Sequence, residues 1–458
     1  MTILAHKRRT QPHRNDTDGR LVLTDGLVVD GDDLPSGGRP AHVAIEGGRI
    51  AFVAAELPSE WREAPQLDAA GAWVLPGFIC LRSHVGEPGY EWREDVATAS
   101  LAAAAGGFTT ICATPDTSPV NDVRAVTEQL MTRAAAAEGA TVLPVGAATR
   151  GLEGRHLAEM GDLESAGCVA VSTGDLSVES AQMMRRILEY ARSIGLRVFT
   201  SPADVSMARG GLMNEGLASL RLGLPGIPAE AESVAILRDG ILSRLAEWPL
   251  HFQRVSTADG VRALEHLAEL GIPFTADCTP HHLWFDESVV AGFDAVTRVV
   301  PPLRSVRDVT ALRGAVASGL ITAVATDHAP RTRLEKWVEY SDASPGTAGL
   351  ETALGALLEL VRRGALPRAA ALRALTRGPA DVLGRTDLGR LTPGARADLT
   401  LVDADVPWRV EGARLRSRGE NHLFEGAALT GLVRSTVVAG RPVTVNDIEA
   451  EEVKRAYR

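Results

Sequence analysis

Eight short apolar runs, separated by helical patterns, constrain the fold of this chain more than any other feature. The runs occupy residues 78–85, 109–115, 142–149, 168–172, 197–201, 250–256, 274–279 and 321–327. Segments with helical periodicity, among them 122–137, 178–193, 228–247 and 306–318, lie between them. Repeated strand and helix units of this kind are typical of a parallel sheet. Eight such units predict an α/β fold, the TIM-type (β/α)8 barrel.

Both ends of the chain carry shorter alternating segments that do not belong to this pattern. Because chain termini often lie close together, the two groups can pair into one small β-sandwich. The first residues contain Lys7, Arg8, Arg9 and Arg14, without a following apolar segment that would indicate a secretory signal. We therefore expect a mobile basic tail at 1–19, a small β-sandwich domain from 20–75 plus 388–458, and the barrel at 76–387.

Net charge, hydropathy and cysteine content indicate which kinds of partner and which cellular compartment to expect. The net charge of −10 disfavours nucleic acid and anionic membranes, whose negative surfaces would need a basic patch. No segment approaches the roughly 20 apolar residues of a membrane-spanning helix. The four cysteines form no CxxC pair and lie in apolar segments, which indicates reduced core residues. A cytoplasmic protein that binds small molecules or proteins is expected.

Sequence motifs along nearly the whole chain give a more specific indication. They stand at 74–79, 87–89, 103–110, 210–216, 224–230, 279–283, 301–304, 326–330, 349–354 and 417–421. In these segments and in their order the chain resembles the dihydroorotase family of the metal-dependent amidohydrolases. The resemblance implies an amidohydrolase-type barrel in which a zinc-bound hydroxide attacks a cyclic amide.

The resemblance also implies a set of metal ligands, and most of those positions are changed here. Of the ligands, His84 after strand one and Asp327 after strand eight are retained. The others are replaced, by Arg82 at strand one, Thr173 and Gly174 at strand four, Ser201 at strand five and Arg254 at strand six. Because guanidinium groups are cationic and offer no lone pair, they repel a divalent ion. We therefore expect no cofactor and no bound metal, with His84 and Asp327 vestigial and Asp327 not functional as a catalytic residue.

Positions that the resemblance assigns to the substrate pocket are altered as well. Gly86 replaces an arginine, Asp116 and Val300 replace asparagines, and Arg331 replaces a histidine. The hypothesis for the new arginines is that Arg82 or Arg254 pairs with Asp327 and supplies the charge that zinc once supplied.

Several further residues near the strand ends allow alternative interpretations. His281 and His282 are expected to be packing residues. Asp175 and Asp204 would face inward only after a register change. Solvent exposure of both arginines is the alternative to their pairing with Asp327.

The loss of these ligands leads to a functional expectation. We expect a catalytically inactive dihydroorotase homologue of pyrimidine biosynthesis, an oligomeric structural or regulatory partner of aspartate carbamoyltransferase subunits. One alternative is an active amidohydrolase, acting on dihydroorotate or another cyclic amide, with an altered metal site and zinc. A second alternative is a sensor that binds an anionic metabolite between Arg82 and Arg254.

Overall fold

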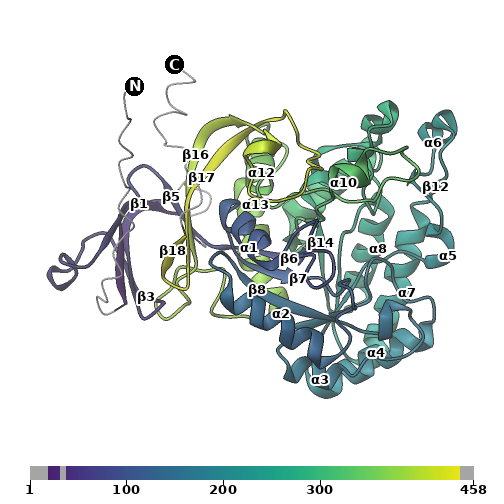
Figure 1. Ribbon diagram of the computed structural model, residues 1–458, viewed down its shortest axis with the longest axis horizontal. Coiled ribbons are helices and arrows are strands. Elements are labelled where there is room, and N and C mark those ends of the chain that lie inside the picture. The colour runs from purple at the N-terminus through teal and green to yellow at the C-terminus, as the bar shows by residue number, and fades with distance from the viewer. Residues whose placement is uncertain (1–18, 31–37, 444–458) are drawn as a thin grey trace, which may run out of the picture.

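The computed structural model describes residues 19–30 and 38–443, which form a barrel and a separate sheet (Figure 1). The barrel strands are β6 (Phe78–Ser83), β7 (Phe108–Ala113), β8 (Thr141–Ala147), β9 (Ala170–Ser172), β10 (Arg197–Thr200), β13 (Leu250–Phe252), β14 (Phe274–Cys278) and β15 (Ala323–Val324). They pair in parallel and in sequence order. The predicted TIM-type barrel is confirmed.

The barrel closes where the first strand meets the segment that follows the last. Ser83 forms a parallel bridge with His328, and the His84 N–H donates to the His328 carbonyl oxygen at 2.7 Å. Every residue of β6 and β7 is buried, as expected for parallel strands that are covered on both faces. The ends of β6 and β15, distant in the sequence, therefore lie side by side.

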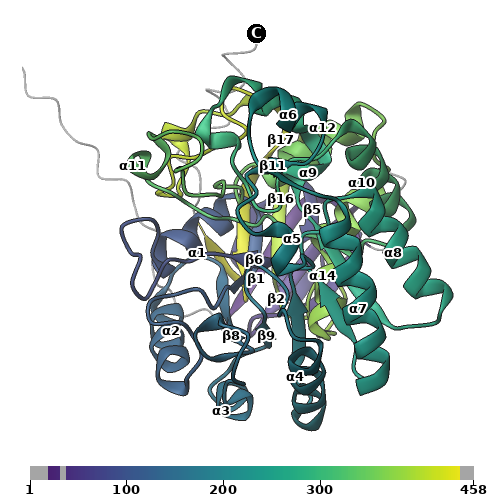
Figure 2. The same ribbon diagram turned by 90° about the vertical axis from the view of Figure 1, so that its right-hand side faces the viewer.

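Helices form the outer layer of the barrel (Figure 2). They are α1 (Val96–Ala105), α2 (Arg124–Ala136), α3 (Met160–Ser165), α4 (Ala181–Ile194), α7 (Glu230–Ala246), α8 (Ala258–Glu269), α10 (Val306–Ser318), α12 (Ala353–Arg362), α13 (Arg368–Leu375) and α14 (Arg377–Leu383). Side-chain caps fix where several of them begin: Asp95 precedes α1 and Ser305 precedes α10, each in a capping box.

Both chain ends contribute to the second sheet, as predicted. Its strands are β1 (Arg20–Val28), β2 (Arg39–Glu46), β3 (Arg49–Ala54), β4 (Gln66–Asp68), β5 (Trp73–Pro76), β16 (Leu399–Arg409), β17 (Ala428–Val438) and β18 (Arg441–Val443). Their order is β18-β17-β16-β5-β1-β2-β3, with β4 beside β1. Apolar side chains from both ends form one core, which includes Leu23, Val43, Leu399 and Val437.

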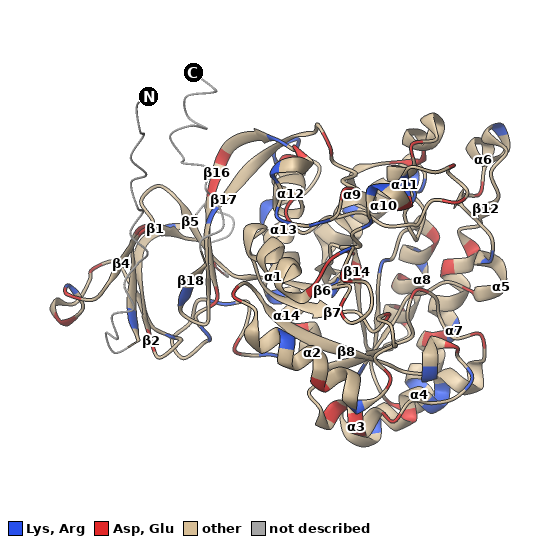
Figure 3. Cartoon of the chain, viewed as in Figure 1, with Lys and Arg blue, Asp and Glu red and all other residues tan. Residues whose placement is uncertain are grey.

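The limits of the domains stay predictions, and part of them lies outside the described residues. This holds for the basic tail, of which only Gly19 is described, and for 444–458. Within the described part, no helix combines the length and apolarity needed to cross a membrane. All four cysteines are free and buried. Basic and acidic residues are interspersed over the outer helices in the view of Figure 3.

Short elements follow the carboxyl ends of the barrel strands and surround the barrel mouth. They are α5 (Val205–Ala208), β11 (Met213–Asn214), α6 (Leu217–Leu222), β12 (Gly226–Ile227), α9 (Pro280–Trp284) and α11 (Arg333–Lys336). The functional groups of a barrel of this type are carried by the loops at this end.

Candidate active site

Arg82, in β6, is the central side chain of the barrel mouth. It is 2% exposed. Its Nε donates to Asp327 Oδ1 at 2.8 Å and its Nη2 to Asp175 Oδ1 at 2.7 Å, while Nη1 reaches Gln253 Oε1 at 3.2 Å. The guanidinium therefore joins residues that follow three other barrel strands.

Arg254, which follows β13, approaches the same two carboxylates and is also 2% exposed. Its Nη2 lies 3.2 Å from Asp175 Oδ1 and its Nη1 lies 3.6 Å from Asp327 Oδ2. It also donates to Ser201 Oγ at 2.8 Å and to the Val300 carbonyl oxygen at 2.7 Å. Both arginines therefore pair with Asp327, as the sequence-based hypothesis requires. That their charge replaces the charge of a metal ion stays a prediction.

Backbone conformation directs two of these side chains into the mouth. Arg254 and Asp327 have φ of 58° and 48°, in the left-handed region that residues other than glycine rarely adopt. Both residues come shortly after a strand, since β13 ends at Phe252 and β15 at Val324. Strained residues of this kind cluster at functional sites, where the surrounding structure holds them in place.

The charges of this cluster stabilise one another. Burial raises the pKa of Asp327, but Arg254 and Arg82 more than offset it and hold that pKa well below its ordinary value. Burial likewise lowers the pKa of Arg82, and Asp327 and Asp175 reverse that shift. Arg82 and Asp327 are therefore both charged at neutral pH.

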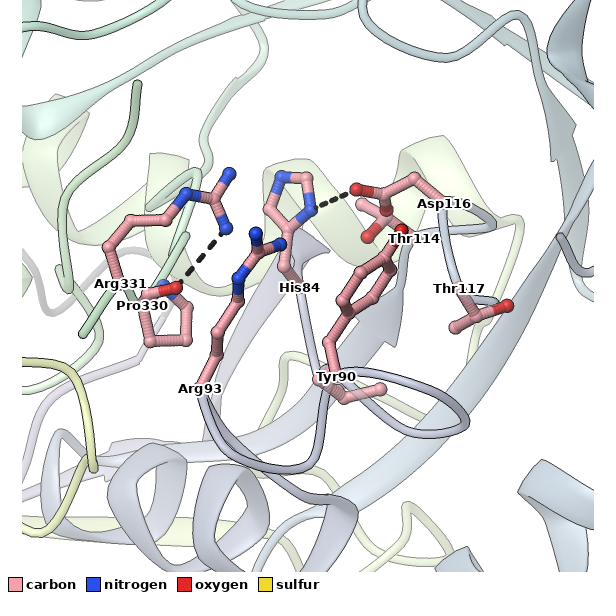
Figure 4. Close-up of a pocket in the computed structure, with 10 residues that line it drawn as sticks. His84, Tyr90, Arg93, Thr114, Asp116, Thr117, Pro330 and Arg331 are labelled. Atoms are coloured by element: carbon pink, nitrogen blue, oxygen red, sulfur yellow. Dashed lines mark hydrogen bonds and ion pairs between the residues drawn. The ribbon is translucent and has the colours of Figure 1, made fainter. Parts of the chain in front are cut away.

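His84 lies beside this cluster and lines a pocket with Asp116 (Figure 4). His84 Nδ1 and Asp116 Oδ2 are 2.7 Å apart, and His84 Nε2 is 4.0 Å from Asp327 Oδ1. Although burial raises the pKa of Asp116, the positive charge that His84 carries when it is protonated and the hydrogen bond from its ring hold that pKa well below its ordinary value. A neutral His84 ring must carry its proton on Nδ1 to donate to Asp116, which leaves Nε2 as a base.

Two arginines line the same pocket, Arg93 and Arg331 (Figure 4). Arg93 comes from the loop that folds over Gly86, where an added Cβ would lie 2.2 Å from the Glu94 carbonyl oxygen. Gly86 has φ of +70°, so this position accepts only glycine. Arg331 donates to the carbonyl oxygens of Pro345 and Pro330, at 2.9 and 3.2 Å. Arg93 is paired with Glu335 at 2.5 Å, so Arg331 is the guanidinium of this pocket that has no carboxylate partner among the described residues, although position 86 carries no arginine.

The other predicted residues have mainly structural contacts. Thr173 Oγ1 bonds to Thr200, Ser201 Oγ donates to the Gly174 carbonyl oxygen, and Asp204 caps α5. His281 and His282 are buried. Burial lowers the pKa of His281 to about 4, and its Nε2 has no hydrogen-bond partner within the described residues.

The side chains of this mouth do not fit the two-metal centre that the resemblance implies. The buried guanidinium groups of Arg82 and Arg254 stand at two positions where the resemblance implies metal ligands. Across 19–30 and 38–443, no three His, Cys, Asp or Glu side chains are grouped so that they could hold a metal ion.

Sequence reasoning missed Arg93 and Gln253, and it misjudged Asp175. Asp175 reaches the arginines without a register change, because the left-handed Gly174, at φ +92°, turns the chain after β9. A glycine directly before an acidic residue at a strand end is the signal that indicates this turn. For Arg93 no signal exists, since its loop carries no periodicity.

Comparison with known proteins adds the following relatives. Residues 71–259 match the family described as dihydro-orotase-like, and 241–444 match the amidohydrolase family. A dihydroorotase of Anaeromyxobacter dehalogenans is 46% identical over 93% of this chain and 98% of its own length. A dihydroorotase of Pelotomaculum thermopropionicum is 43% identical over 93% of this chain and 98% of its own length.

Solved structures agree in fold. The L-hydantoinase of Arthrobacter aurescens superposes with a TM-score of 0.81 at 23% identity, covering 93% of this chain and 96% of its own. A D-hydantoinase gives a TM-score of 0.80 at 21% identity.

These relatives correct two expectations. The expectation of a catalytically inactive homologue is wrong, because relatives that are 43% and 46% identical over almost the full chain are named dihydroorotase. The expectation of no cofactor is wrong for the same reason, since the resemblance implies zinc for the catalytically active members of the dihydroorotase family. The family thus implies a metal that the described side chains, as placed, do not hold.

Proposed function

Because the chain belongs to the dihydroorotase-like family of amidohydrolases, we propose that it is an enzyme that hydrolyses a cyclic amide bearing a carboxylate, of the dihydroorotate class, with an altered metal site. The observation that carries the proposal is the His84–Asp116 pair, 2.7 Å apart, in a pocket lined by Arg93 and Arg331. It provides a base, its orienting carboxylate and positive charge for an anionic substrate in one place.

The residues of the pocket suggest how the amide is opened. A water molecule attacks the ring carbonyl carbon while His84 Nε2 accepts its proton, and Asp116 stabilises the resulting imidazolium. Arg331, whose side chain lies beside His84 in Figure 4, stabilises the negative charge on the carbonyl oxygen. The carbon–nitrogen bond then breaks, and the ring nitrogen takes the proton from His84. One water is consumed: one of its protons ends on the former ring nitrogen, and the other stays on the new carboxyl group until that group releases it to solvent as it becomes a carboxylate.

Turnover of dihydroorotate by the purified chain tests this proposal. We expect hydrolysis that His84→Gln reduces by about 10²- to 10⁴-fold in kcat, since a general base contributes that factor. His156→Gln, which changes an exposed histidine, is the matched control and leaves kcat unchanged. The assay is run with and without added zinc, and the zinc content of the same sample is measured. Absence of turnover under both conditions would overturn the proposal.

Association with aspartate carbamoyltransferase subunits is a separate prediction, and an active hydrolase is compatible with it. Its support is two separate groups of largely exposed apolar side chains, Leu217 and Leu220 on α6 and Leu334 on α11. Size-exclusion chromatography of the mixed proteins tests it, with Leu220→Asp as the disrupting variant. An unchanged elution of both proteins would contradict it.

A further inference from the structure

Asp175 differs in environment from every other member of the charge cluster that it shares with Arg82, Arg254 and Asp327. The two arginines are 2% exposed and the Asp327 side chain 6%, whereas the Asp175 side chain is 59% exposed. Yet its Oδ1 accepts from Arg82 at 2.7 Å and lies 3.2 Å from Arg254 Nη2. An exposed carboxylate thus supplies one of the two counter-charges for two buried guanidiniums.

The contacts of Asp175 allow its side chain to leave while its backbone stays. Its carbonyl oxygen accepts from Arg254 Nη2 at 3.0 Å, and the preceding Gly174 carbonyl oxygen accepts from Ser201 at 2.8 Å. Within the described residues, its carboxylate has no hydrogen-bond donor other than Arg82, with Arg254 Nη2 as its second ion-pair partner. A change of side-chain rotamer is therefore sufficient to free the guanidiniums.

Asp327, in contrast, cannot leave. It is buried and held by Arg82 Nε at 2.8 Å. With Asp175 turned to solvent, two guanidiniums would face one carboxylate, so one positive charge would lack a partner. In a buried setting such a charge binds an anion strongly, because water does not screen it.

A small cavity also lies beside the cluster. Its lining includes Asp175, Ser201, Gln253 and Val300, each of which contacts one or both guanidiniums. A ligand in this cavity meets the arginines as soon as the Asp175 carboxylate moves aside.

We propose that Asp175 is an internal latch on a carboxylate-binding site formed by Arg82 and Arg254, and that the carboxylate of a bound ligand displaces it. The choice of ligand class rests on the proposed function, and the site itself does not. His84 lies next to the site, since Asp327 Oδ1 is 2.8 Å from Arg82 Nε and 4.0 Å from His84 Nε2. A cyclic amide whose carboxylate is held there would present its ring to the His84 pocket.

Isothermal titration calorimetry with two probes tests the latch. Orotate carries a carboxylate on a planar ring that does not open, and uracil is the same ring without the carboxylate. We expect Asp175→Asn to bind orotate about tenfold more tightly than the wild type, because the competing internal charge is gone. Binding of uracil stays unchanged. Glu179→Gln removes an equal charge from the same exposed segment without touching the arginines and is the matched control.

A second readout shows whether the variant keeps its fold. Without ligand, Asp175→Asn is expected to melt at a lower temperature than Glu179→Gln, and orotate is expected to raise its melting temperature more than that of the wild type. A variant that is folded but binds orotate with the wild-type Kd or more weakly would overturn the latch. Failure of orotate to bind either protein would overturn it too.

The failure of the latch and of the proposed function are distinguishable. Tighter orotate binding by Asp175→Asn without any dihydroorotate turnover would contradict the proposed hydrolase function and support the displacement of Asp175. Turnover by the wild type, with the same orotate affinity in the wild type and in Asp175→Asn, would support the hydrolase function and contradict the displacement of Asp175.

Discussion

At the scale of single residues, the barrel mouth is a compact arrangement of opposite charges. Arg82 and Arg254 are buried, and each contacts both Asp327 and Asp175. Removing one partner of a buried pair is costly because the other charge stays in a medium of low polarity. For Arg82 and Asp327, several contacts together, rather than any single one, offset the effect of burial on the pKa.

The first residue-scale prediction concerns Arg82. We expect Arg82→Met to lower the free energy of unfolding by about 3–5 kcal/mol, since Asp327 is left buried without its closest partner. Urea denaturation measures the change. Arg150→Met is the control, because Arg150 forms an exposed ion pair with Glu159, and a loss of at most about 1 kcal/mol is expected there. Equal losses in the two variants would show that Asp327 does not depend on Arg82.

The second prediction concerns acid. Neighbouring arginines hold the pKa of Asp327 below the value of about 3.9 that an aspartate has in an unfolded chain. Its contribution to stability is therefore complete above about pH 4 and is lost as the pH falls toward the folded-state pKa. We expect Asp327→Asn to flatten the decline in unfolding free energy between about pH 4 and pH 2, whereas Asp342→Asn, at an exposed position, leaves it unchanged. Parallel pH curves for wild type and Asp327→Asn would contradict this.

At the scale of elements, one helix fastens the loop that carries Arg254. Glu232 on α7 accepts hydrogen bonds from the backbone and side chains of Ser256 and Thr257, with distances from 2.6 to 3.1 Å. The carboxylate thus satisfies donors at the point where the chain leaves β13.

Removal of this carboxylate gives the third prediction. We expect Glu232→Ala to lower the unfolding free energy by about 2–4 kcal/mol, because buried donors of Ser256 and Thr257 lose their acceptor. Thermal and urea unfolding measure it. Glu230→Ala, at the exposed start of the same helix, is expected to cost no more than about 1 kcal/mol. A loss at Glu232 as small as that at Glu230 would contradict the anchoring role.

The elements also show how far the sequence predicts this structure. Apolar periodicity locates all eight barrel strands, yet β13 ends at Phe252 and β15 at Val324, earlier than the apolar runs indicate. Arg254 and Asp327, which follow these strand ends, take left-handed conformations that no hydrophobic pattern encodes. Positions at strand ends are predictable as site residues. Arg93, from a loop whose course depends on tertiary contacts, is not.

At the scale of the whole molecule, the small sheet is attached to the barrel through buried hydrogen bonds. Thr400 Oγ1 donates to the Gly107 carbonyl oxygen at 2.6 Å and Thr436 Oγ1 to that of Ala104 at 2.7 Å. The sheet also combines strands from both chain ends, so it forms only when the two ends meet.

This attachment gives the fourth prediction. We expect one calorimetric unfolding transition for barrel and sheet together, with a van't Hoff enthalpy equal to the calorimetric one. The double substitution Thr400→Val and Thr436→Val is expected to broaden or split that transition, because it removes both bonds. Two resolved transitions in the wild-type protein would show that the sheet unfolds independently.

The meeting of β6 with the end of β15 has a consequence for the order of events during translation. Arg82 and Asp327 are 245 positions apart, so the ribosome completes most of the barrel before this buried partner of Arg82 is made. Until Asp327 is made, the guanidinium cannot be buried against it, and β6 has no closing neighbour in the barrel. The ion pair therefore forms only after the last barrel strand has been made, and its burial accompanies closure of the barrel.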